Sequence, residues 1–277
     1  MAKIKNAKPK QKSGGYERLL GNKEMASIFT KAQSTVISNG TELEKIIIGF
    51  SNKIYDLDAF INDCDTGTIT DGTYLCSKKV VGCSSYKLNR HEPDFIVFVV
   101  GKTGNECFVI ELKDGDAFDT KKSFVEKELL KLFVNHFAPK VPFKTKFFIC
   151  CFNQPDKNKI VAGLKGAFDI DEVMTGEELC DVLNINYNDI VKMRQDDATD
   201  NLNYVSENMI FAILGAHMNE NELKMFKEFC KTHNINGVDA MVNAIKQQCV
   251  RVSSGQPHNF APQIKNNIAV IDSRPSA

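Results

Sequence analysis

Hydrophobic positions along this chain follow two periods, one typical of strands and one typical of helices. Two β-branched and aromatic runs, residues 93–100 and 106–113, flank a five-residue segment that contains Gly101 and Gly104. This pattern predicts a β-hairpin. Residues 146–152 form a continuous apolar run, which is typical of a strand buried on both faces.

Apolar residues at helical spacing predict helices on either side of these strands. A break at Asn39-Gly40 is expected between two early helices, and Thr41 with Glu44 forms a capping box at the start of the second. A second capping box is expected between Thr175 and Glu178. The helices predicted in this way cover residues 23–38, 41–54, 123–137, 159–168, 176–183 and 187–193, with further helices from residue 207 onward. The segment 57–92 is expected to be irregular, with short strand-like runs such as residues 79–81.

This order of elements predicts an α/β (α+β) fold, with a central mixed β-sheet flanked by helices on both faces. Three parts are expected: a basic flexible arm (1–15), a core (16–200) and a helical C-terminal extension (201–277) for dimerisation or DNA contact. The arm carries five lysines and ends in Ser-Gly-Gly, a composition typical of a solvated tail. The alternative is an arm that lies along phosphates and adds affinity without sequence information.

Composition narrows the class of protein. The chain has 277 residues, 43% of them hydrophobic, and no apolar run approaches the roughly 20 residues that span a bilayer. Nine cysteines, without regular spacing and mostly within apolar runs, predict reduced thiols and a cytoplasmic location. The 35 basic and 35 acidic residues give a net charge of zero, so a protein of this composition that binds nucleic acid must segregate its charge.

The far end of the predicted hairpin gathers charged side chains. Glu111 and Lys113 share one face of their strand, whereas Leu112 points to the other. If the turn is centred on residue 103, Asp94 lies opposite Leu112 and one position from Glu111. Mg²⁺ commonly binds one or two carboxylates plus a substrate phosphate, and a neighbouring lysine can orient or deprotonate a water or stabilise a pentacoordinate phosphate. The pattern therefore fits metal-assisted hydrolysis of a phosphodiester.

Pro93-Asp94 followed by Glu111-Leu112-Lys113 resembles the signature of the PD-(D/E)XK nuclease superfamily. The resemblance extends over the first helix, the hairpin, the crossover helix and the buried strand. It implies that Asp94 and Glu111 are metal ligands, that the carbonyl of Leu112 is an additional ligand, and that Lys113 is the catalytic lysine. The implied cofactor is Mg²⁺.

Many members of this superfamily add an acidic residue from the helix that precedes the hairpin. The resemblance implies Glu44 for this role, with Glu42 as the alternative, and nothing in the spacing chooses between them. The segment 172–180 also resembles the closing part of stand-alone type II restriction endonucleases.

The function expected from this resemblance is site-specific cleavage of double-stranded DNA by a homodimer, whose twofold symmetry matches a symmetric site. A companion DNA methyltransferase acting on the same site is the expected partner. Two alternatives remain: a structure-selective DNA repair or recombination nuclease, and a non-catalytic DNA-binding protein on this fold. Arg90, Arg194 and Arg251 are candidates for guanine contacts, and Asn153-Gln154 is either a DNA contact or a polar turn.

Overall fold

The computed structural model of this protein describes residues 3–8, 14–89, 91–101, 104–115, 120–235 and 240–243. The chain forms two compact units: one is Ser38–Arg194, and the other comprises the described residues of Ala2–Ile37 and Gln195–Ala277. The boundaries fall inside two long helices, α2 (Lys23–Phe50) and α8 (Tyr187–Gly215). All the catalytic and metal-binding residues predicted from the sequence belong to the first unit.

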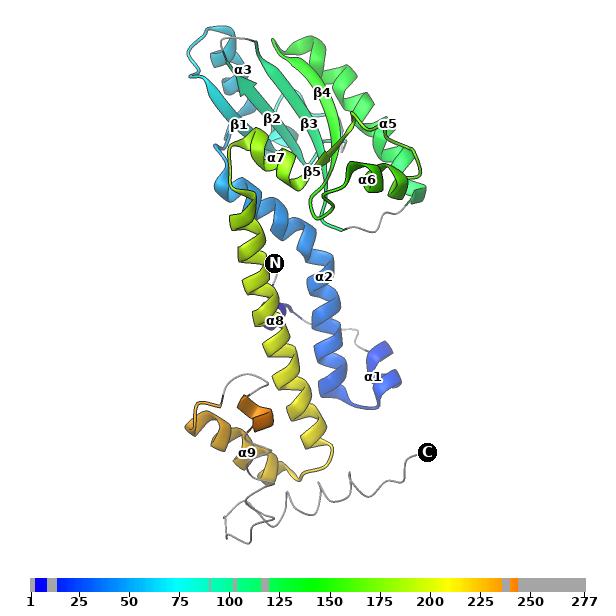
Figure 1. The fold of residues 1–277 in the computed structure, drawn as a ribbon, viewed down its shortest axis with the longest axis vertical. Helices are drawn as coiled ribbons and strands as arrows, with labels where there is room; N and C mark the ends of the chain where they lie inside the picture. Colours follow the sequence, from blue (N-terminus) through cyan, green and yellow to red (C-terminus); the bar gives the residue numbers. More distant parts are fainter. Residues whose placement is uncertain are drawn as a thin grey trace. The chain divides into compact units, whose positions relative to one another are not determined.

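The first unit is built on a five-stranded sheet in which the strands follow the order β1-β2-β3-β4-β5 (Figure 1). The first three strands are antiparallel neighbours, and the last two join in parallel. The strands are β1 (Gly72–Ser77), β2 (Phe95–Val100), β3 (Glu106–Lys113), β4 (Lys144–Cys151) and β5 (Val173–Thr175). The predicted mixed sheet with helices on both faces is therefore confirmed.

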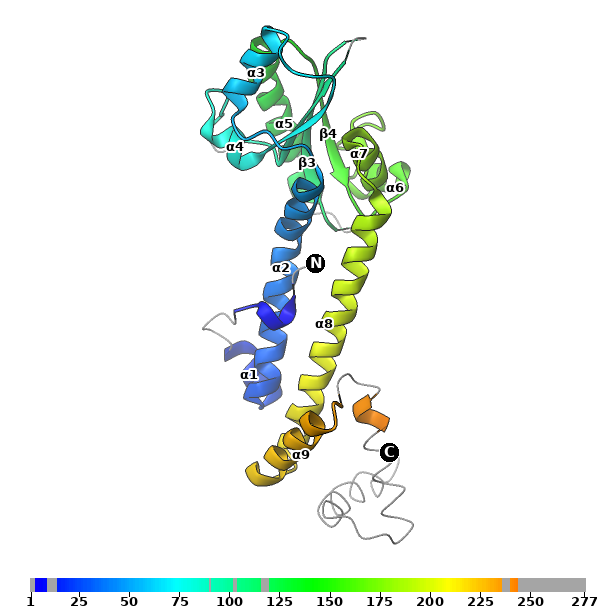
Figure 2. The ribbon, with the colours of Figure 1, turned by 90° about the vertical axis from the view of Figure 1, so that its left-hand side faces the viewer.

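Alternate residues of each strand point to opposite faces of the sheet, so the unit has two hydrophobic cores. Ile96 and Phe98 belong to one core, and Phe95 and Val97 belong to the other. Figure 2 shows α3 and α4 on one side of the sheet and α7 on the other. The first core is completed by α3 (Leu57–Asp65), α4 (Lys78–Cys83), α5 (Thr120–Phe137) and α6 (Lys157–Gly163). The second core is completed by the end of α2 and by α7 (Gly176–Leu183).

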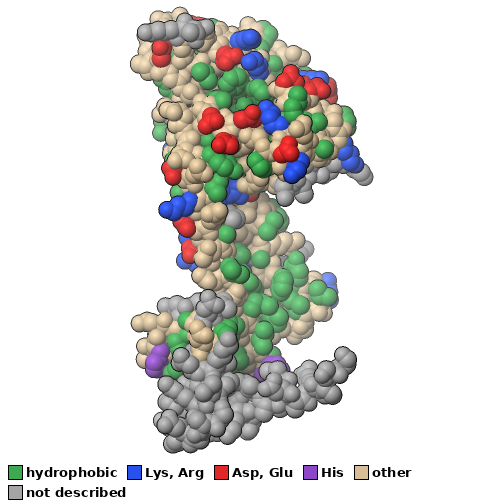
Figure 3. Space-filling view, in the orientation of Figure 1, with side chains coloured by type: hydrophobic (Ala, Val, Ile, Leu, Met, Phe, Trp, Pro, Cys, Tyr) green, Lys and Arg blue, Asp and Glu red, His purple; other side chains and the backbone are tan. Residues whose placement is uncertain are grey.

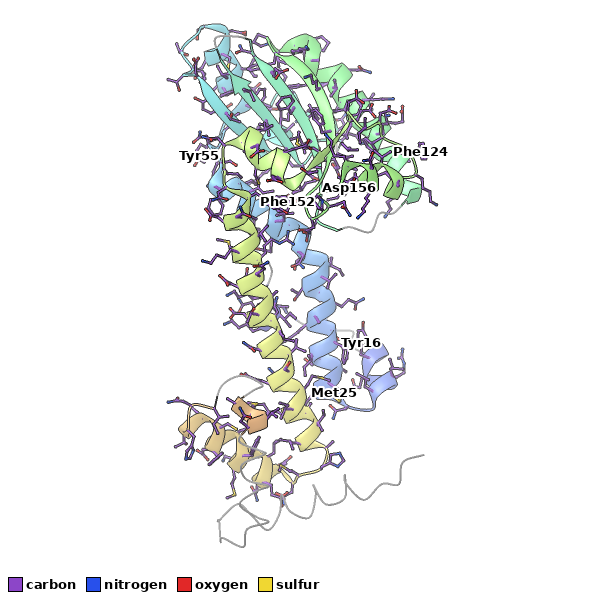
Figure 4. All side chains as sticks on the ribbon, in the orientation of Figure 1. Tyr16, Met25, Tyr55, Phe124, Phe152 and Asp156 are labelled. Carbon is purple, nitrogen blue, oxygen red and sulfur yellow. The ribbon has the colours of Figure 1, made fainter. Side chains whose placement is uncertain are left out.

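Several local predictions are confirmed. The helix after the hairpin is α5, which ends in the short 3-10 helix η2 (Ala138–Lys140), and the buried strand is β4. The capping box is present at the start of α7, where Thr175 Oγ1 accepts a hydrogen bond from the amide of Glu178 and the Thr175 amide donates to Glu178 Oε2. Asp156, labelled in Figure 4, accepts from the Asn158 amide and caps α6.

The predicted break at Asn39-Gly40 is wrong, because α2 is continuous through both residues. A glycine inside a helix costs about 1 kcal/mol relative to alanine. The buried side chains of Leu43 and Ile47 on the following turns offset that cost by packing against the sheet. Thr41 is consequently an interior residue of α2 and does not begin a helix. The short helix predicted at 187–193 is likewise only the beginning of the 29-residue α8.

The strand-like run at residues 79–81 is also predicted wrongly, because it lies in α4. Valine favours strands only weakly, and tertiary packing readily overrides that preference. Here the helical conformation places Val81, which is fully buried, in the first core.

The hairpin forms as predicted, but its register differs by one residue. Phe95 pairs with Ile110, so continuing the register places Asp94 opposite Glu111 rather than Leu112. Where β3 begins, the carbonyl of Asn105 accepts a hydrogen bond from the Lys144 amide of β4, and the Asn105 side chain accepts one from the Gly101 amide. The observed register brings the two acidic residues closer together than the predicted one.

The regular elements in the described residues of the second unit are all helices. It contains the 3-10 helix η1 (Ile4–Asn6), α1 (Gly14–Leu20), the first part of α2, most of α8, and α9 (Glu220–Thr232). Lys3 pairs with Asp200 (2.7 Å) and Asp197 (3.3 Å) on α8. The prediction of further helices from residue 207 onward is confirmed over α9. The division into arm, core and C-terminal extension stays a prediction.

None of the helices in the described part of the chain is long and apolar enough to cross a membrane. On the face of the first unit shown in Figure 3, acidic and basic side chains are interspersed. The segregation of charge required of a nucleic-acid-binding protein of this composition is not visible on that face.

Substitution of Gly176 by alanine is expected to destabilise the protein by about 1–3 kcal/mol, because the added methyl group would overlap the carbonyl oxygen of Phe152 at the end of β4. Gly40→Ala is the matched control. A side chain at residue 40 meets open space within a helix, so this substitution is expected to stabilise the protein by about 0.5–1 kcal/mol. Denaturant unfolding of both variants measures the two effects, and equal stabilities would contradict the packing described here.

Candidate active site

The carboxylate of Asp94 is fixed where β2 begins. Its Oδ2 accepts a hydrogen bond from the backbone amide of Leu112 (3.0 Å), and its Oδ1 accepts one from Lys78 Nζ (3.3 Å). The side chain is only 12% exposed. The hairpin thus holds one carboxylate in a defined orientation beside the end of β3.

Glu111 and Lys113 lie next to this carboxylate on one face of β3, as predicted. Lys113 Nζ donates to Glu111 Oε1 at 3.0 Å and to Glu126 Oε1 of α5 at 2.7 Å. Burial, and then the nearby Asp94 carboxylate, raise the pKa of Glu111. Burial by itself would lower the pKa of Lys113, but Glu111 and Glu126 together raise it, so Lys113 is held as an ammonium ion.

Lys78, at the start of α4, is a second cation in this cluster. It donates to Asp94, and its charge also interacts with Glu111 and Glu44. Burial opposes its charged form, yet these carboxylates outweigh burial and raise the pKa of Lys78. Lys78 therefore offsets part of the repulsion between the carboxylates.

The structure places Glu44 near the cluster and distinguishes it from Glu42. Burial, followed by the negative charge of Asp94, raises the pKa of Glu44. Glu42 instead pairs with Lys45 (2.6 Å), one turn along the same helix. Of the two acidic residues considered on this helix, Glu44 is the one whose charge interacts with Asp94.

A pocket opens beside the cluster, between the start of β2 and α5. Glu111, Glu126 and Lys78 lie on its wall, so solvent and a ligand reach the charged groups. His91, which precedes Asp94 by three residues in the sequence, lies on the same wall. The remaining lining residues are Glu92, Pro93, Leu129 and Leu130.

Arg194 and Asn153 form a separate structural network. Arg194 Nη2 pairs with Asp114 Oδ1 at 2.5 Å, and Asn153 Nδ2 donates to the same carboxylate at 3.0 Å. The guanidinium also lies 5.9 Å from the ring of Phe152, which is labelled in Figure 4. Because the Arg194 side chain is 10% exposed, this network supports a structural role rather than a guanine contact. Arg90 and Arg251 lie outside the described residues.

Sequence reasoning missed Lys78 and Glu126, the two residues that complete the cluster. Each lies on a helix that reaches the hairpin only through tertiary packing, and neither occurs at a fixed spacing from the motif. A weak signal was available for Glu126: it is the only acidic residue in the first two turns of α5, which also hold two lysines.

The chemistry of the cluster fits a hard divalent cation. Four carboxylates (Asp94, Glu111, Glu126 and Glu44) and two ammonium groups (Lys78 and Lys113) give a formal charge of −2. Within the part of the chain that the structure describes, no three His, Cys, Asp or Glu side chains are grouped at metal-binding distances. A cation here would take two protein carboxylates and complete its shell with backbone, water and substrate oxygens, as Mg²⁺ commonly does.

A mixed sheet with two carboxylates and a lysine at one hairpin end is the arrangement expected of a metal-dependent phosphodiesterase. Comparison with known proteins agrees with this class. The chain is 44% identical over 215 residues to the type II restriction enzyme HhaII of Haemophilus parahaemolyticus, a match that covers 76% of this chain and 94% of that protein.

The chain therefore belongs to the type II restriction enzyme family. The function predicted from the sequence is confirmed at the level of this family. No protein-family model matches the chain, and no solved structure matches it.

Proposed function

We propose that this protein cleaves double-stranded DNA at a specific site by Mg²⁺-dependent hydrolysis, with a PD-(D/E)XK active site at the end of the β2–β3 hairpin. One observation carries the proposal: in a chain of the type II restriction enzyme family, the fold brings Asp94, Glu111 and Lys113 together beside an open pocket. The proposed roles follow from the chemistry of these groups.

Asp94 and Glu111 would hold the cation, with the carbonyl of Leu112 as an additional ligand. Mg²⁺ bound there supplies Lewis-acid stabilisation of the negative charge that develops on the phosphodiester. The Leu112 amide keeps the Asp94 carboxylate oriented, so little reorganisation is needed when the substrate binds. Glu44 is proposed to contribute further negative charge from α2.

Lys113 is proposed to act through its Nζ protons. Because two carboxylates hold it as an ammonium ion, it is suited to donate hydrogen bonds to the attacking water or to a phosphate oxygen. Because an ammonium ion cannot accept a proton, Lys113 is suited to orient the attacking water and to stabilise negative charge on the phosphate, and not to deprotonate the water.

A homodimer is proposed because two copies of one active site match the two strands of a symmetric DNA site. Hydrophobic side chains gather on the face of the second unit that Figure 3 shows. Among the residues of this unit, Leu19, Val36 and Leu202 are each at least 66% exposed. Exposed apolar surface of this kind is typical of interaction sites. Light scattering of the purified protein is expected to give the mass of a dimer, and a monomer mass would contradict the proposed homodimer. A companion methyltransferase and a cytoplasmic location remain parts of the proposal.

The experiment that tests this function is digestion of plasmid DNA with Mg²⁺ and, in parallel, with EDTA. Discrete fragments are expected with Mg²⁺ and none with EDTA, because the carboxylates alone cannot stabilise the developing charge. Cleavage only of branched or nicked DNA would favour a structure-selective nuclease. DNA retention without cleavage, unaffected by Mg²⁺, would favour a non-catalytic DNA-binding protein.

A further inference from the structure

Glu126 occupies a position in the cluster that the motif does not account for. It lies on α5, which packs against the first core through Leu130 and Phe133, and it reaches back to the end of β3. Its Oε1 is 2.7 Å from Lys113 Nζ, closer than the 3.0 Å that separates Lys113 from Glu111. Its side chain is 23% exposed and lies on the wall of the pocket.

These contacts hold the Lys113 ammonium from two directions. A lysine side chain has four rotatable bonds and loses considerable freedom when its end is fixed. One hydrogen bond to a neighbour on its own strand restrains it only partly. A second bond, to a residue on a helix packed across the sheet face, restricts the ammonium to a much smaller volume.

Glu111 and Glu126, the two carboxylates that hold Lys113, differ in their other interactions. Glu111 lies beside Asp94, and the negative charge of Asp94 acts on it directly. Glu126 contacts Lys113, and within the described residues it does not join Asp94 and Glu111 in a three-member metal-binding group. If Glu111 shares its charge with a cation, its attraction for Lys113 weakens, whereas that of Glu126 persists.

We propose that Glu126 is a positioning residue that holds the Lys113 ammonium in place at the scissile phosphate while Glu111 serves the metal ion. This inference rests on the proposed function. It assigns to α5 a part of the active site that lies outside the hairpin motif. Glu126 acts through Lys113 and does not itself touch the reacting atoms.

The test compares Glu126→Ala with Glu126→Gln in single-turnover cleavage of an oligonucleotide duplex that spans a cut site mapped with the wild-type protein. Misplacing a catalytic group by about 1 Å can slow a reaction about 100-fold, and we expect a loss of that size for Glu126→Ala. Glu126→Gln keeps a hydrogen-bond acceptor at the same place, so it is expected to retain about tenfold more activity than Glu126→Ala.

Binding measurements separate positioning from the other roles of a carboxylate. The dissociation constant for the duplex, measured with Ca²⁺ in place of Mg²⁺, is expected to stay within about threefold of wild type, as is Mn²⁺ affinity measured by electron paramagnetic resonance. Glu128→Ala is the matched control, because Glu128 lies two residues away on the same helix, is 73% exposed and pairs with Lys131. This control is expected to cleave at the wild-type rate.

Three results would overturn the inference: a wild-type rate for Glu126→Ala, equal losses for the alanine and glutamine variants, or a loss of Mn²⁺ affinity parallel to the loss of rate. The last result would make Glu126 a metal ligand. Failure of the wild-type protein to cleave any DNA is a different outcome, because it would contradict the proposed function itself.

Discussion

Replacement of Asp94 by asparagine is expected to slow DNA cleavage by about a thousandfold or more. The substitution removes one of the two carboxylates proposed to hold the cation, and metal-ion stabilisation of a transition state is worth several kcal/mol, or about tenfold for each 1.4 kcal/mol. The asparagine side-chain oxygen can still accept the hydrogen bond from the Leu112 amide, so the hairpin is expected to keep its geometry. The bond from Lys78 involves a half-exposed lysine and adds little stability.

Asp58→Asn is the matched control for this prediction. The Asp58 carboxylate also accepts a hydrogen bond from a backbone amide, that of Ser85 (3.0 Å), but it lies on α3 and not in the charged cluster at the hairpin end. Single-turnover rates of both variants at saturating Mg²⁺ measure the effect, with thermal unfolding as a check on folding. Near-wild-type cleavage by Asp94→Asn would show that Asp94 does not belong to the active site.

Replacement of Lys113 by methionine is expected to reduce the cleavage rate by about a hundredfold to ten-thousandfold, the range typical of a lost proton-transfer or hydrogen-bonding group. Methionine preserves most of the aliphatic stem, so the change mainly removes the ammonium. It also leaves Glu111 and Glu126 without their shared partner, which is expected to lower the free energy of unfolding by about 1–3 kcal/mol.

Lys127→Met separates the loss of activity from the loss of an ion pair. Lys127 is 13% exposed and also bridges two carboxylates, Glu172 at 2.5 Å and Asp169 at 3.3 Å, so its removal is expected to lower stability by a similar amount. Both of its partners lie outside the charged cluster at the hairpin end, and its variant is expected to cleave normally. If the two variants lost activity equally, the effect of Lys113 would be one of stability rather than of chemistry.

Strands β2, β3 and β4 and the motif residues could be predicted from the sequence because they depend on local patterns, whereas β1 and β5 were not predicted. Alternation along β3 places Glu111 and Lys113 on one face, and the hairpin brings Asp94 beside them. The predicted register was off by one residue because it assumed a turn centred on residue 103, and the alternation of strand residues does not fix the centre of the turn.

The helical parts of the cluster could not be predicted in the same way. Lys78 lies in a segment with strand-like residues that becomes a helix because Val81 is buried in the first core. Glu126 was recognised as a residue of a helix, but which helix face meets β3 is decided by packing of the whole helix against the sheet. Glu44 was implied by the resemblance alone, and it lies near Asp94 on α2, which continues without the expected break.

The central claim is that the hairpin cluster cuts DNA at a defined sequence. Sequencing of the ends produced from genomic DNA by the wild-type protein with Mg²⁺, beside Glu111→Gln, tests it most directly. We predict that the wild-type ends all adjoin one short sequence shared by both strands, and that Glu111→Gln produces no such ends. Ends scattered over unrelated sequences, or the same ends from Glu111→Gln, would contradict the claim.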